Sequence, residues 1–542
     1  MHTTTTRGII ALLTAAGALS LATVGAQAKD LAVSAQAAES AASFTMPAGD
    51  FRTEADAAAA GALNQAPRLS PTPAAKLARI KKMAGAAEAA AVDEAAPQAG
   101  RALFKECVTN AGAGNAPSDI HGAVAPTNII VVTNVHVGIF NKTTCGTVSF
   151  LTLKTFFSQN GGFVIPATET LFDPRVLFDR LSSRCIITVE SRNSGNTDQF
   201  LYIASSRDSS CTTWRRIRFV LSRVNPAALF CKETASDFYD FPNSGYNIRR
   251  LVTTSNNFRT NNTSYGTLLS IDKVALHGTA AVVARCFRTS LPTNMAPAVV
   301  GDTNNSMFIL SPGSGSGSSV NRRRLDPVGS GSGLADTLTN TGNVAIPAWS
   351  APPDAAQPNG QRLDTLDGRF QGASKQIGTL IWNTHSENSG GFARVRTYRF
   401  STTGGLLASR TTTTSACASQ HTFNPSVDTN STSTSALAYI TYSRTCPTVA
   451  GTGNAAHLIS RGANTLAGGF IFTSVEISAM QFTNDGLGHS CNTVPVRFSC
   501  RWGDYSATQI DPSDTGRAWG FNQLVTGTTM FNWNTRGAKV GP

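Results

Sequence analysis

Residues 129–140 read IIVVTNVHVGIF and residues 147–157 read TVSFLTLKTFF, with Asn-Lys-Thr-Thr-Cys-Gly between them. Both runs are rich in β-branched and aromatic residues, and apolar residues alternate with polar ones over much of their length. That composition and period are typical of half-buried strands. The polar segment between the runs, which ends in a glycine, suits a turn. We therefore expect β-structure to begin in this region.

Similar short runs recur along the chain, separated by Gly, Asn, Pro and Ser. They are Arg175–Asp179, Cys185–Val189, Phe200–Ser205, Trp214–Leu221, Arg250–Thr254, Thr267–Ile271, Ala281–Cys286, Met307–Leu310, Gly378–Trp382, Val395–Phe400, Ala436–Tyr442 and Val494–Phe498. No amphipathic segment of helical length lies between them, which excludes a doubly wound α/β enzyme. Many short strands fit either a pair of sandwiches or a propeller. At roughly 50–70 residues per four-stranded blade, six to eight blades fit, and seven are favoured. We predict an all-β protein with a single β-propeller over residues 115–540.

The N-terminus has the features of a secretory signal peptide over residues 1–28. A basic residue, Arg7, precedes an apolar run from Gly8 to Val24, and Ala26-Gln27-Ala28 suits cleavage. No second apolar span of membrane length follows. We expect a secreted protein without a membrane span, extracellular or, in a Gram-negative bacterium, periplasmic.

Residues 29–105 differ from the rest in composition. They are rich in alanine and poor in aromatic residues, and no β pattern develops in them. The composition between Pro73 and Ala96 allows a helix. This segment is expected to be a partly helical or disordered linker, or a pro-region, and the sequence leaves both alternatives open.

Ten cysteines lie between Cys107 and Cys500, an even number that fits disulfides in an exported chain. We predict the pair Cys491–Cys500, which flanks a probable strand pair, and then the pair Cys417–Cys446. No two cysteines stand two to four residues apart, so a cysteine-ligated metal is not expected.

Charge patterning narrows the choice of partner. The formal net charge is +12, but only 14% of the residues are charged and the arginines are scattered. A nucleic-acid binder concentrates its basic residues, so we expect none to be bound. The one tight cluster, Arg322–Arg324, lies in a Gly/Ser-rich tract at 311–334 that is expected to be a flexible insertion, and the Pro-rich residues 340–359 are expected to be irregular. The basic balance favours an extracellular polysaccharide or cell-surface polymer as partner, with the protein a monomer.

Five segments of the predicted propeller resemble one family. They are Asp119–Pro126, Asp173–Leu181, Asp237–Tyr246, Leu363–Phe370 and the closing Arg501–Ser506. Together they are similar to secreted bacterial β-propeller-like proteins, most of them without an assigned activity. Because the segments reach both ends of the predicted domain, the resemblance implies a ring closed by pairing C-terminal strands with N-terminal ones.

The resemblance also has departures. Phe172 stands where the family has a glycine before its Asp-Pro, and Cys185 stands where a tryptophan follows an arginine. Residues Ser206–Trp214 form a degenerate copy of the Asp-box turn of sialidase-like propellers, without its glycine. In that motif the aspartate accepts backbone N–H groups and the tryptophan packs between sheets.

The most specific family segments contain the candidate catalytic residues. Asp367 lies beside Arg369, and Asp504 lies beside Arg501 and Tyr505. A carboxylate paired with an arginine can serve as a general acid or base, and a tyrosine can serve as a nucleophile. The alternative is that each Asp–Arg pair is structural and closes a turn.

Other chemistry is supported less well. Three tryptophans in or near these segments, Trp382, Trp502 and Trp519, are candidate sugar contacts. The histidines match no zinc-hydrolase pattern, and no serine matches the pattern of an α/β hydrolase. The turns at Asp302–Asn305 and Asp485-Gly486 could hold calcium, although plain turn chemistry accounts for them, so no cofactor is expected beyond a structural calcium.

Two functions remain open from the sequence. The first is a secreted propeller that binds an extracellular polymer or glycan without catalysis. The alternative is a secreted glycan hydrolase or lyase that uses carboxylates at the mouth of the propeller.

Overall fold

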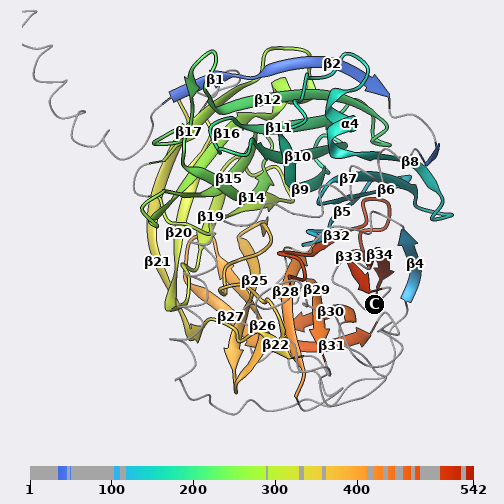
Figure 1. The fold of residues 1–542 in the computed structure, drawn as a ribbon. Coiled ribbons are helices and arrows are strands. Elements are labelled where there is room, and N and C mark those ends of the chain that lie inside the picture. Colours follow the sequence, from blue (N-terminus) through green and yellow to red (C-terminus); the bar gives the residue numbers. More distant parts are fainter. Residues whose placement is uncertain are drawn as a thin grey trace, which may run out of the picture.

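The computed structural model describes residues 34–45, 49–50, 103–109, 117–288, 291–328, 335–356, 362–411, 419–430, 432, 438–445, 456–464, 470–476, 501–525 and 533–541. Within these residues the strands group into seven antiparallel four-stranded units, which are arranged around a common centre (Figure 1). This arrangement is a seven-bladed β-propeller, as predicted.

Blades 1 to 4 follow one another along the chain. Blade 1 holds β5 (His121–Val124), β6 (Asn128–Thr133), β7 (His136–Asn141) and β8 (Thr147–Thr152). Blade 2 holds β9 (Thr170–Asp179), β10 (Arg184–Arg192), β11 (Gln199–Ser206) and β12 (Thr213–Arg223), with β13 (Ala228–Leu229) at its edge. Blade 3 holds β14 (Phe238–Tyr246), β15 (Arg250–Phe258), β16 (Ser264–Asp272) and β17 (Val283–Phe287). Blade 4 holds β18 (Ala296–Val300), β19 (Met307–Ser311), β20 (Ser316–Asp326) and β21 (Thr337–Ser350).

Blades 5 to 7 complete the ring. A small hairpin of β22 (Ala355–Ala356) and β23 (Arg362–Leu363) precedes blade 5, which holds β24 (Ser374–Ile377), β25 (Leu380–Ser389), β26 (Phe392–Ser401) and β27 (Leu406–Thr411). Blade 6 holds β28 (His421–Asp428), β29 (Ala438–Thr445), β30 (Ala456–Asn464) and β31 (Phe470–Glu476). Blade 7 holds β32 (Ala507–Ile510), β33 (Ala518–Val525), β34 (Trp533–Val540) and β4 (Leu103–Thr109).

The two opening runs of the sequence fold differently from two plain strands. Residues 129–140 form a hairpin rather than one strand, because the chain turns at Asn134 and Val135, where φ is +82°. The run at 147–157 changes from β8 to a short helix, α4 (Leu153–Ser158). The Thr152 side chain caps this helix by accepting the Thr155 N–H. Polar capping chemistry inside an apolar run therefore ends the strand early.

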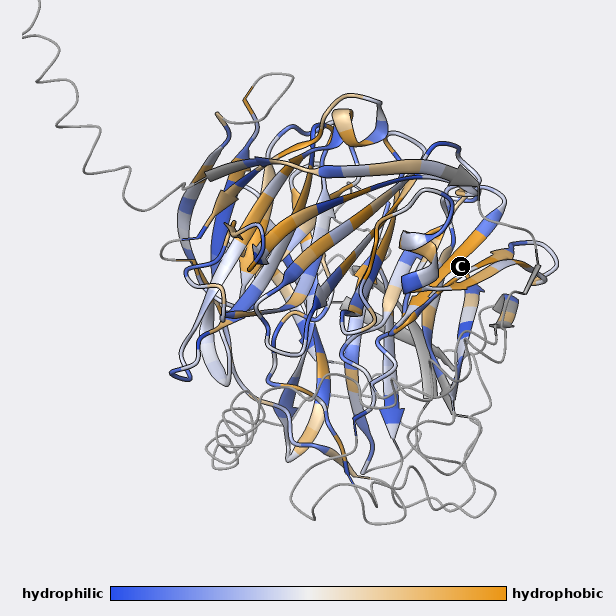
Figure 2. Ribbon diagram, turned by 45° about the horizontal axis from the view of Figure 1, so that its top comes forward, coloured by the Kyte–Doolittle hydropathy of each residue, from blue (hydrophilic) through white to orange (hydrophobic). Residues whose placement is uncertain are grey.

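Apolar side chains of the blades form the core. Figure 2 shows apolar residues concentrated along the strands, with polar residues between them. One core cluster joins blades 1 and 2 through residues such as Ile139, Phe157, Val189 and Trp214, all of them buried. Packing between neighbouring blades therefore replaces the face-to-face packing of a sandwich.

The innermost strands of the blades run parallel where they meet at the centre. β14 pairs with β18 through Tyr246 and Val299, and β18 pairs with β24. These parallel contacts merge blades 3, 4 and 5 into one continuous sheet. Inner strands that run the same way begin at the same end of the channel, which brings the residues at their starts together.

The ring is closed by the N-terminal strand β4. It pairs antiparallel with β34, so that Cys107 lies opposite Gly537. This confirms the closure that the resemblance implied. It also corrects the domain boundary, because the propeller takes in residues 103–109 and not only residues from 115 onward.

The alanine-rich N-terminal segment contains strands that were not predicted. β1 (Ser34–Ala37) adds to β17, β2 (Glu39–Thr45) adds to β12, and β3 (Gly49–Asp50) lies parallel to β8. We call β1 and β2 the strap, which runs along the outside of blades 3 and 2 (Figure 1). Backbone pairing at a sheet edge accepts most side chains, so an alanine-rich composition did not reveal it. The predicted signal peptide and the predicted helix at 73–96 lie outside the described residues.

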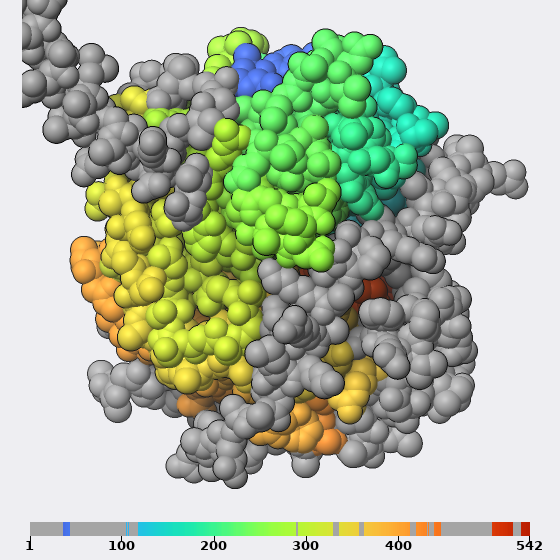
Figure 3. Space-filling model, turned by 60° about the vertical axis from the view of Figure 1, so that its left-hand side comes forward, coloured from blue at the N-terminus to red at the C-terminus, as the bar shows by residue number. Residues whose placement is uncertain are grey.

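Blade 4 corrects the expectation of a flexible Gly/Ser insertion at 311–334. Residues Ser316–Asp326 form β20, and Thr337–Ser350, expected to be irregular in part, form β21. The small residues have a packing role, because a Cβ on Gly317 would lie 3.2 Å from the Trp349 Nε1 atom. Blades 2 to 4, green to yellow in Figure 3, lie next to one another on one side of the molecule, with the blue strap above them.

Three disulfides join described cysteines: Cys107–Cys145, Cys185–Cys211 and Cys231–Cys286. Such bonds persist in oxidising compartments. The predicted pairs Cys491–Cys500 and Cys417–Cys446 lie outside the described residues. No helix among the described residues is long and apolar enough to cross a membrane.

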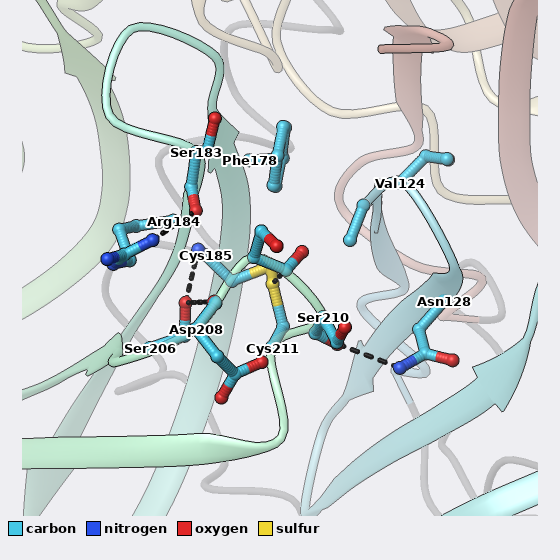
Figure 4. Close-up of a disulfide and its surroundings, with 12 residues drawn as sticks. Val124, Asn128, Phe178, Ser183, Arg184, Cys185, Ser206, Asp208, Ser210 and Cys211 are labelled. Atoms are coloured by element: carbon cyan, nitrogen blue, oxygen red, sulfur yellow. Dashed lines mark hydrogen bonds between the residues drawn. A yellow bond between two sulfur atoms is a disulfide. The ribbon is translucent and has the colours of Figure 1, made fainter. Parts of the chain in front are cut away.

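The disulfide between Cys185 and Cys211 links two of the departures from the family pattern (Figure 4). Cys185 replaces the expected tryptophan, and Cys211 lies in the degenerate Asp-box. The box keeps its turn chemistry, since Asp208 accepts the N–H groups of Thr212 and Thr213. Trp214 is buried against Phe156, with ring centroids 5.5 Å apart. A covalent bond thus ties the Asp-box turn to β10 at the position of the missing tryptophan.

Ring closure leads to a prediction about the Cys107–Cys145 disulfide, which ties β4 to the β7–β8 turn of blade 1. Replacing both cysteines with alanine should lower the free energy of unfolding by about 2–5 kcal/mol. Residues 103–109 should also exchange amide hydrogens faster, because β4 loses its covalent tie to blade 1. Denaturant unfolding and hydrogen exchange would measure the two effects.

The matched control replaces Cys185 and Cys211, which are joined within blade 2. It should destabilise the protein without exposing residues 103–109. Equal protection of β4 in both double variants would contradict the closing role of the Cys107–Cys145 bond.

Candidate functional site

The starts of the inner strands share an unusual backbone conformation. Asp119, Asp173, Phe241, Leu366 and Asn424 all have φ between +43° and +60°. This left-handed region is unfavourable for residues other than glycine, and such positions cluster at ligand sites and active sites. Asp173, Phe241 and Asn424 lie in the first half of an inner strand. Asp119 lies just before β5, and Leu366 lies in the segment that leads to β24.

Charged side chains from these positions gather into what we call the mouth cluster. Its members are Asp119, Asp173, Arg175, Glu190, Asp240, Arg369, Arg501 and Asp504. Most of them precede or begin an inner strand. Glu190 lies near the end of β10, which runs opposite to β9 and therefore finishes at the same end. Blades 1, 2, 3, 5 and 7 all contribute.

Arg501 and Asp504 form the most accessible part of the cluster. The Arg501 guanidinium contacts the Asp504 carboxylate at 2.5 Å and the Asp364 carboxylate at 3.0 Å. The Arg501 side chain is 25% exposed and the Asp504 side chain 13%. These carboxylates raise the pKa of Arg501 further above its ordinary value. The backbone N–H of Asp504 donates to the Asp119 carboxylate at 2.8 Å, which joins blade 7 to blade 1.

Arg369 and Asp367 form a second pair, from blade 5. Two parallel hydrogen bonds of 2.7 Å and 3.0 Å join the guanidinium to the carboxylate. The Arg369 guanidinium also lies over the Phe241 ring at 4.4 Å. The bidentate geometry and the cation–π contact fix this arginine in one orientation.

Arg175 and Tyr505 form the buried centre of the cluster. The Arg175 guanidinium donates to the carbonyl oxygens of Pro242 and Gln371, each at 3.0 Å, and lies 3.3 Å from the Tyr505 ring centroid. The Tyr505 hydroxyl donates to the Pro174 carbonyl at 2.9 Å. Burial raises the pKa of Tyr505 well above its ordinary value. A hydroxyl held in this way serves as a structural anchor and does not fit the role of nucleophile.

The carboxyl groups of the cluster are set far from their ordinary acidity. Burial, and after it the charge of Asp504, raises the pKa of Asp119 to about 7. The same two causes raise the pKa of Asp240 to about 6. Burial also raises the pKa of Asp173 and of Glu190 well above the usual range, and neighbouring carboxylates add to both effects. Strongly perturbed carboxyl groups that gather in one place are characteristic of functional sites.

The structure brings the four predicted catalytic residues together. Asp367, Arg369, Asp504 and Tyr505 all lie at this end of the channel, although they come from blades 5 and 7. The predicted sugar-binding tryptophans do not fit their role, because Trp382 is 0% exposed, Trp502 3% and Trp519 1%. Their rings pack inside the blades, where a sugar cannot stack on them.

Five cluster residues were not singled out from the sequence, although a signal existed for most of them. Asp119, Asp173 and Asp240 each lie in a segment that resembles the family, as does Arg175. Glu190 carries no such signal. It lies near the end of β10, directly after the apolar run Cys185–Val189, and belongs to none of these segments.

Further along the channel lies a cavity of about 50 Å³ that residues of all seven blades line, among them His121, Tyr246, Lys375 and Asp428. The Lys375 ammonium and the Asp428 carboxylate form an ion pair of 2.9 Å at its wall. Sites for drug-sized ligands occupy roughly 300–1,000 Å³, so this cavity is too small for a sugar.

Fold and site together define a seven-bladed β-propeller with a charged cluster at one end of its channel. No protein-family model matches the chain, and no curated protein sequence matches it. Among solved structures, an α-L-arabinofuranosidase from Fusarium graminearum aligns with 81% of this chain and 98% of its own, at 8% identity and a TM-score of 0.38.

Two further structures align in a similar way. A sialidase from Trypanosoma rangeli covers 71% of this chain and 57% of its own, at 10% identity and a TM-score of 0.34. A subtype N10 neuraminidase-like protein of a bat influenza A virus covers 64% and 96%, also at 10% identity and a TM-score of 0.34. Scores this low carry no argument about activity, and the propeller assignment rests on the strand pairing described above.

The position of Arg175 leads to a prediction about stability. Its guanidinium joins blade 2 to carbonyl groups of blades 3 and 5 and to the Tyr505 ring. Arg175→Lys should lower the free energy of unfolding by about 2–4 kcal/mol, because an ammonium cannot make both hydrogen bonds and the stacked contact. Denaturant unfolding measures the loss.

The control is Arg324→Lys, which alters a half-exposed arginine paired with Asp326. Its effect should stay within about 0.5 kcal/mol. Equal stability of the two variants would show that Arg175 does not hold the blades together.

Proposed function

We propose that the protein is an exported enzyme that hydrolyses a glycan at the mouth cluster, with Asp504 as the carboxylate that meets the substrate. The observation that carries this proposal is the contrast between two neighbouring carboxyl groups. Asp119 has a pKa raised to about 7, whereas Asp504 is paired with Arg501 and partly exposed. A buried carboxyl group with a raised pKa thus lies beside a carboxyl group that is paired with an arginine and partly exposed.

Glycoside hydrolysis needs this combination. A carboxylic acid gives its proton to the leaving oxygen, while a carboxylate activates water or attacks the sugar carbon. Asp119 would supply the proton and Asp504 the carboxylate. The partly exposed Arg501 would hydrogen-bond sugar hydroxyl or carboxylate groups. The glycan class follows from the Asp-box resemblance and the basic balance of the chain, and the disulfides support export.

A second candidate function is binding without catalysis. It is favoured by the ion pairs Arg369–Asp367 and Arg501–Asp504, which already satisfy both of these carboxylates. In that case the cluster would fix the ring and present arginines to a polymer. The experiment below separates the two functions.

The experiment incubates the full chain with a panel of neutral and acidic polysaccharides and measures retention and newly formed reducing ends. Wild-type protein should release product, and Asp504→Asn should lower the rate by about 10²–10⁴-fold while retention persists. Asp514→Asn, which changes a surface aspartate of the β32–β33 turn paired with Arg517, should leave the rate unchanged.

Each other outcome decides between the functions. Retention without product in the wild type would identify a binding protein. If the wild-type protein showed no retention and formed no product with any polysaccharide of the panel, a glycan would be excluded as the partner. Product at an unchanged rate from Asp504→Asn would remove Asp504 from the mechanism.

The pH dependence of the reaction gives an independent test. If protonated Asp119 is the acid, kcat/KM should fall about tenfold per pH unit above about pH 7, since Asp119 loses its proton there. The pH profile of reducing-end release measures this. A rate that rises through pH 7 would contradict the assignment of Asp119.

A further inference from the structure

Three carboxyl groups of the mouth cluster lie unusually close together. Carboxylate oxygens of Asp173, Glu190 and Asp240 all lie within 4.8 Å of one another. They come from β9, β10 and β14, strands of two neighbouring blades. Two oxygens that bind the same calcium ion at about 2.4 Å can be at most about 4.8 Å apart, so the spacing suits a shared ion.

Glu190 has no partner in the described part of the chain. Its side chain is fully buried, and neither carboxylate oxygen accepts a hydrogen bond there. A buried carboxylate without donors or counter-charge is strongly unfavourable. Both of its oxygens are therefore free to bind an ion from within the group.

The nearby arginines lie close enough to be felt by the three groups but form no direct ion pair with them. Among the described residues, no ion pair joins an arginine or lysine to Asp173, Glu190 or Asp240. The Arg175 guanidinium is engaged by two backbone carbonyls and by the Tyr505 ring. The Arg192 guanidinium lies 4.6 Å from the Phe238 ring centroid and donates to Asn196 at 3.0 Å. In the described part of the chain, no basic side chain therefore contacts the three carboxyl groups directly.

We propose that Asp173, Glu190 and Asp240 form a calcium site between blades 2 and 3. Carboxylate oxygens are the ligands of hard divalent cations. Calcium fits better than magnesium, because it accepts irregular shells of six to eight oxygens, whereas magnesium demands a near-ideal octahedron and keeps its water. Water completes the shell. The ion holds the inner strands of the two blades together, and this role does not depend on the proposed hydrolysis.

The test uses the full chain, freed of metal with a chelator and titrated with Ca²⁺ by calorimetry. We expect binding with a dissociation constant on the order of 10⁻⁴ M or tighter. Calcium should also raise the unfolding temperature relative to protein in chelator, because it binds only the folded site. Mg²⁺ should bind more weakly. No polysaccharide is present, so failure of the hydrolysis proposal cannot affect the outcome.

The decisive variant is Glu190→Gln, which removes one charge at nearly constant volume. It should weaken Ca²⁺ binding at least about tenfold and abolish the rise in unfolding temperature. The matched control is Glu169→Gln in the same region of blade 2. Glu169 is also buried, but Ser191 and Tyr202 donate to its carboxylate at 2.7 Å and 2.8 Å. This variant should bind Ca²⁺ as the wild type does.

Three results would overturn the proposal. The first is a wild-type protein with the same unfolding temperature in calcium and in chelator. The second is unchanged affinity in Glu190→Gln, which would place any bound calcium elsewhere. The third is a Glu190→Gln variant that is more stable than the wild type both in calcium and in chelator, while calcium changes the unfolding temperature of neither protein. That result would mean that the three carboxyl groups are held together by shared protons and not by a metal ion.

Discussion

Seven inner strands share one narrow channel, so the residues at their starts must pack against one another whatever their charge. This constraint exists only because the ring is closed, and closure depends on the pairing of β4 with β34. An open chain of blades would let the first and last inner strands separate. Asp119 of blade 1 and Asp504 of blade 7 would then lose the hydrogen bond that joins them. The charged residues at the centre therefore meet only because the ring is closed.

The charged side chains of the cluster are accommodated differently near the surface and at the buried centre. Near the surface, arginines pair with Asp364, Asp367 and Asp504. At the centre, Arg175 is held by backbone carbonyls and an aromatic ring instead of a carboxylate. Around it remain carboxyl groups whose pKa values are raised by burial. Carboxyl groups buried in this way lower the folding stability, and their gathering in one place is characteristic of functional sites.

The sequence predicted the fold well in those strands whose apolar side chains form the core. Short alternating runs revealed most of the blade strands, and the segments at both ends of the domain revealed closure. Strands held by backbone pairing were missed, because alanine in β1 and β2, and glycine and serine in β20, carry little strand signal. The hairpin at Asn134 and the helix after Thr152 were missed because single polar residues redirected an apolar run.

The candidate site was predictable only in part, for a physical reason. Asp367, Arg369, Asp504 and Tyr505 were singled out because they lie in distinctive segments, and their part in catalysis stays a prediction. Glu190 became notable only when β14 of the next blade brought Asp240 beside it, and no pattern within β10 contains that information. The tryptophans failed as ligand contacts because a large aromatic side chain in a propeller more often fills the space between sheets.

The strap has a consequence for how the molecule behaves among its own copies. The outermost strand of a blade presents unpaired N–H and C=O groups, which can template pairing with another chain. β1 and β2 occupy those positions on blades 3 and 2, and Glu39 holds the strap through ion pairs with Arg218 and Arg223. The chain thus covers two of its own sheet edges with a segment that adds only small side chains, such as Ala38 and Ala41, to the margin of the core. Loss of these few residues would leave the fold in place and turn two satisfied edges into sites for aggregation.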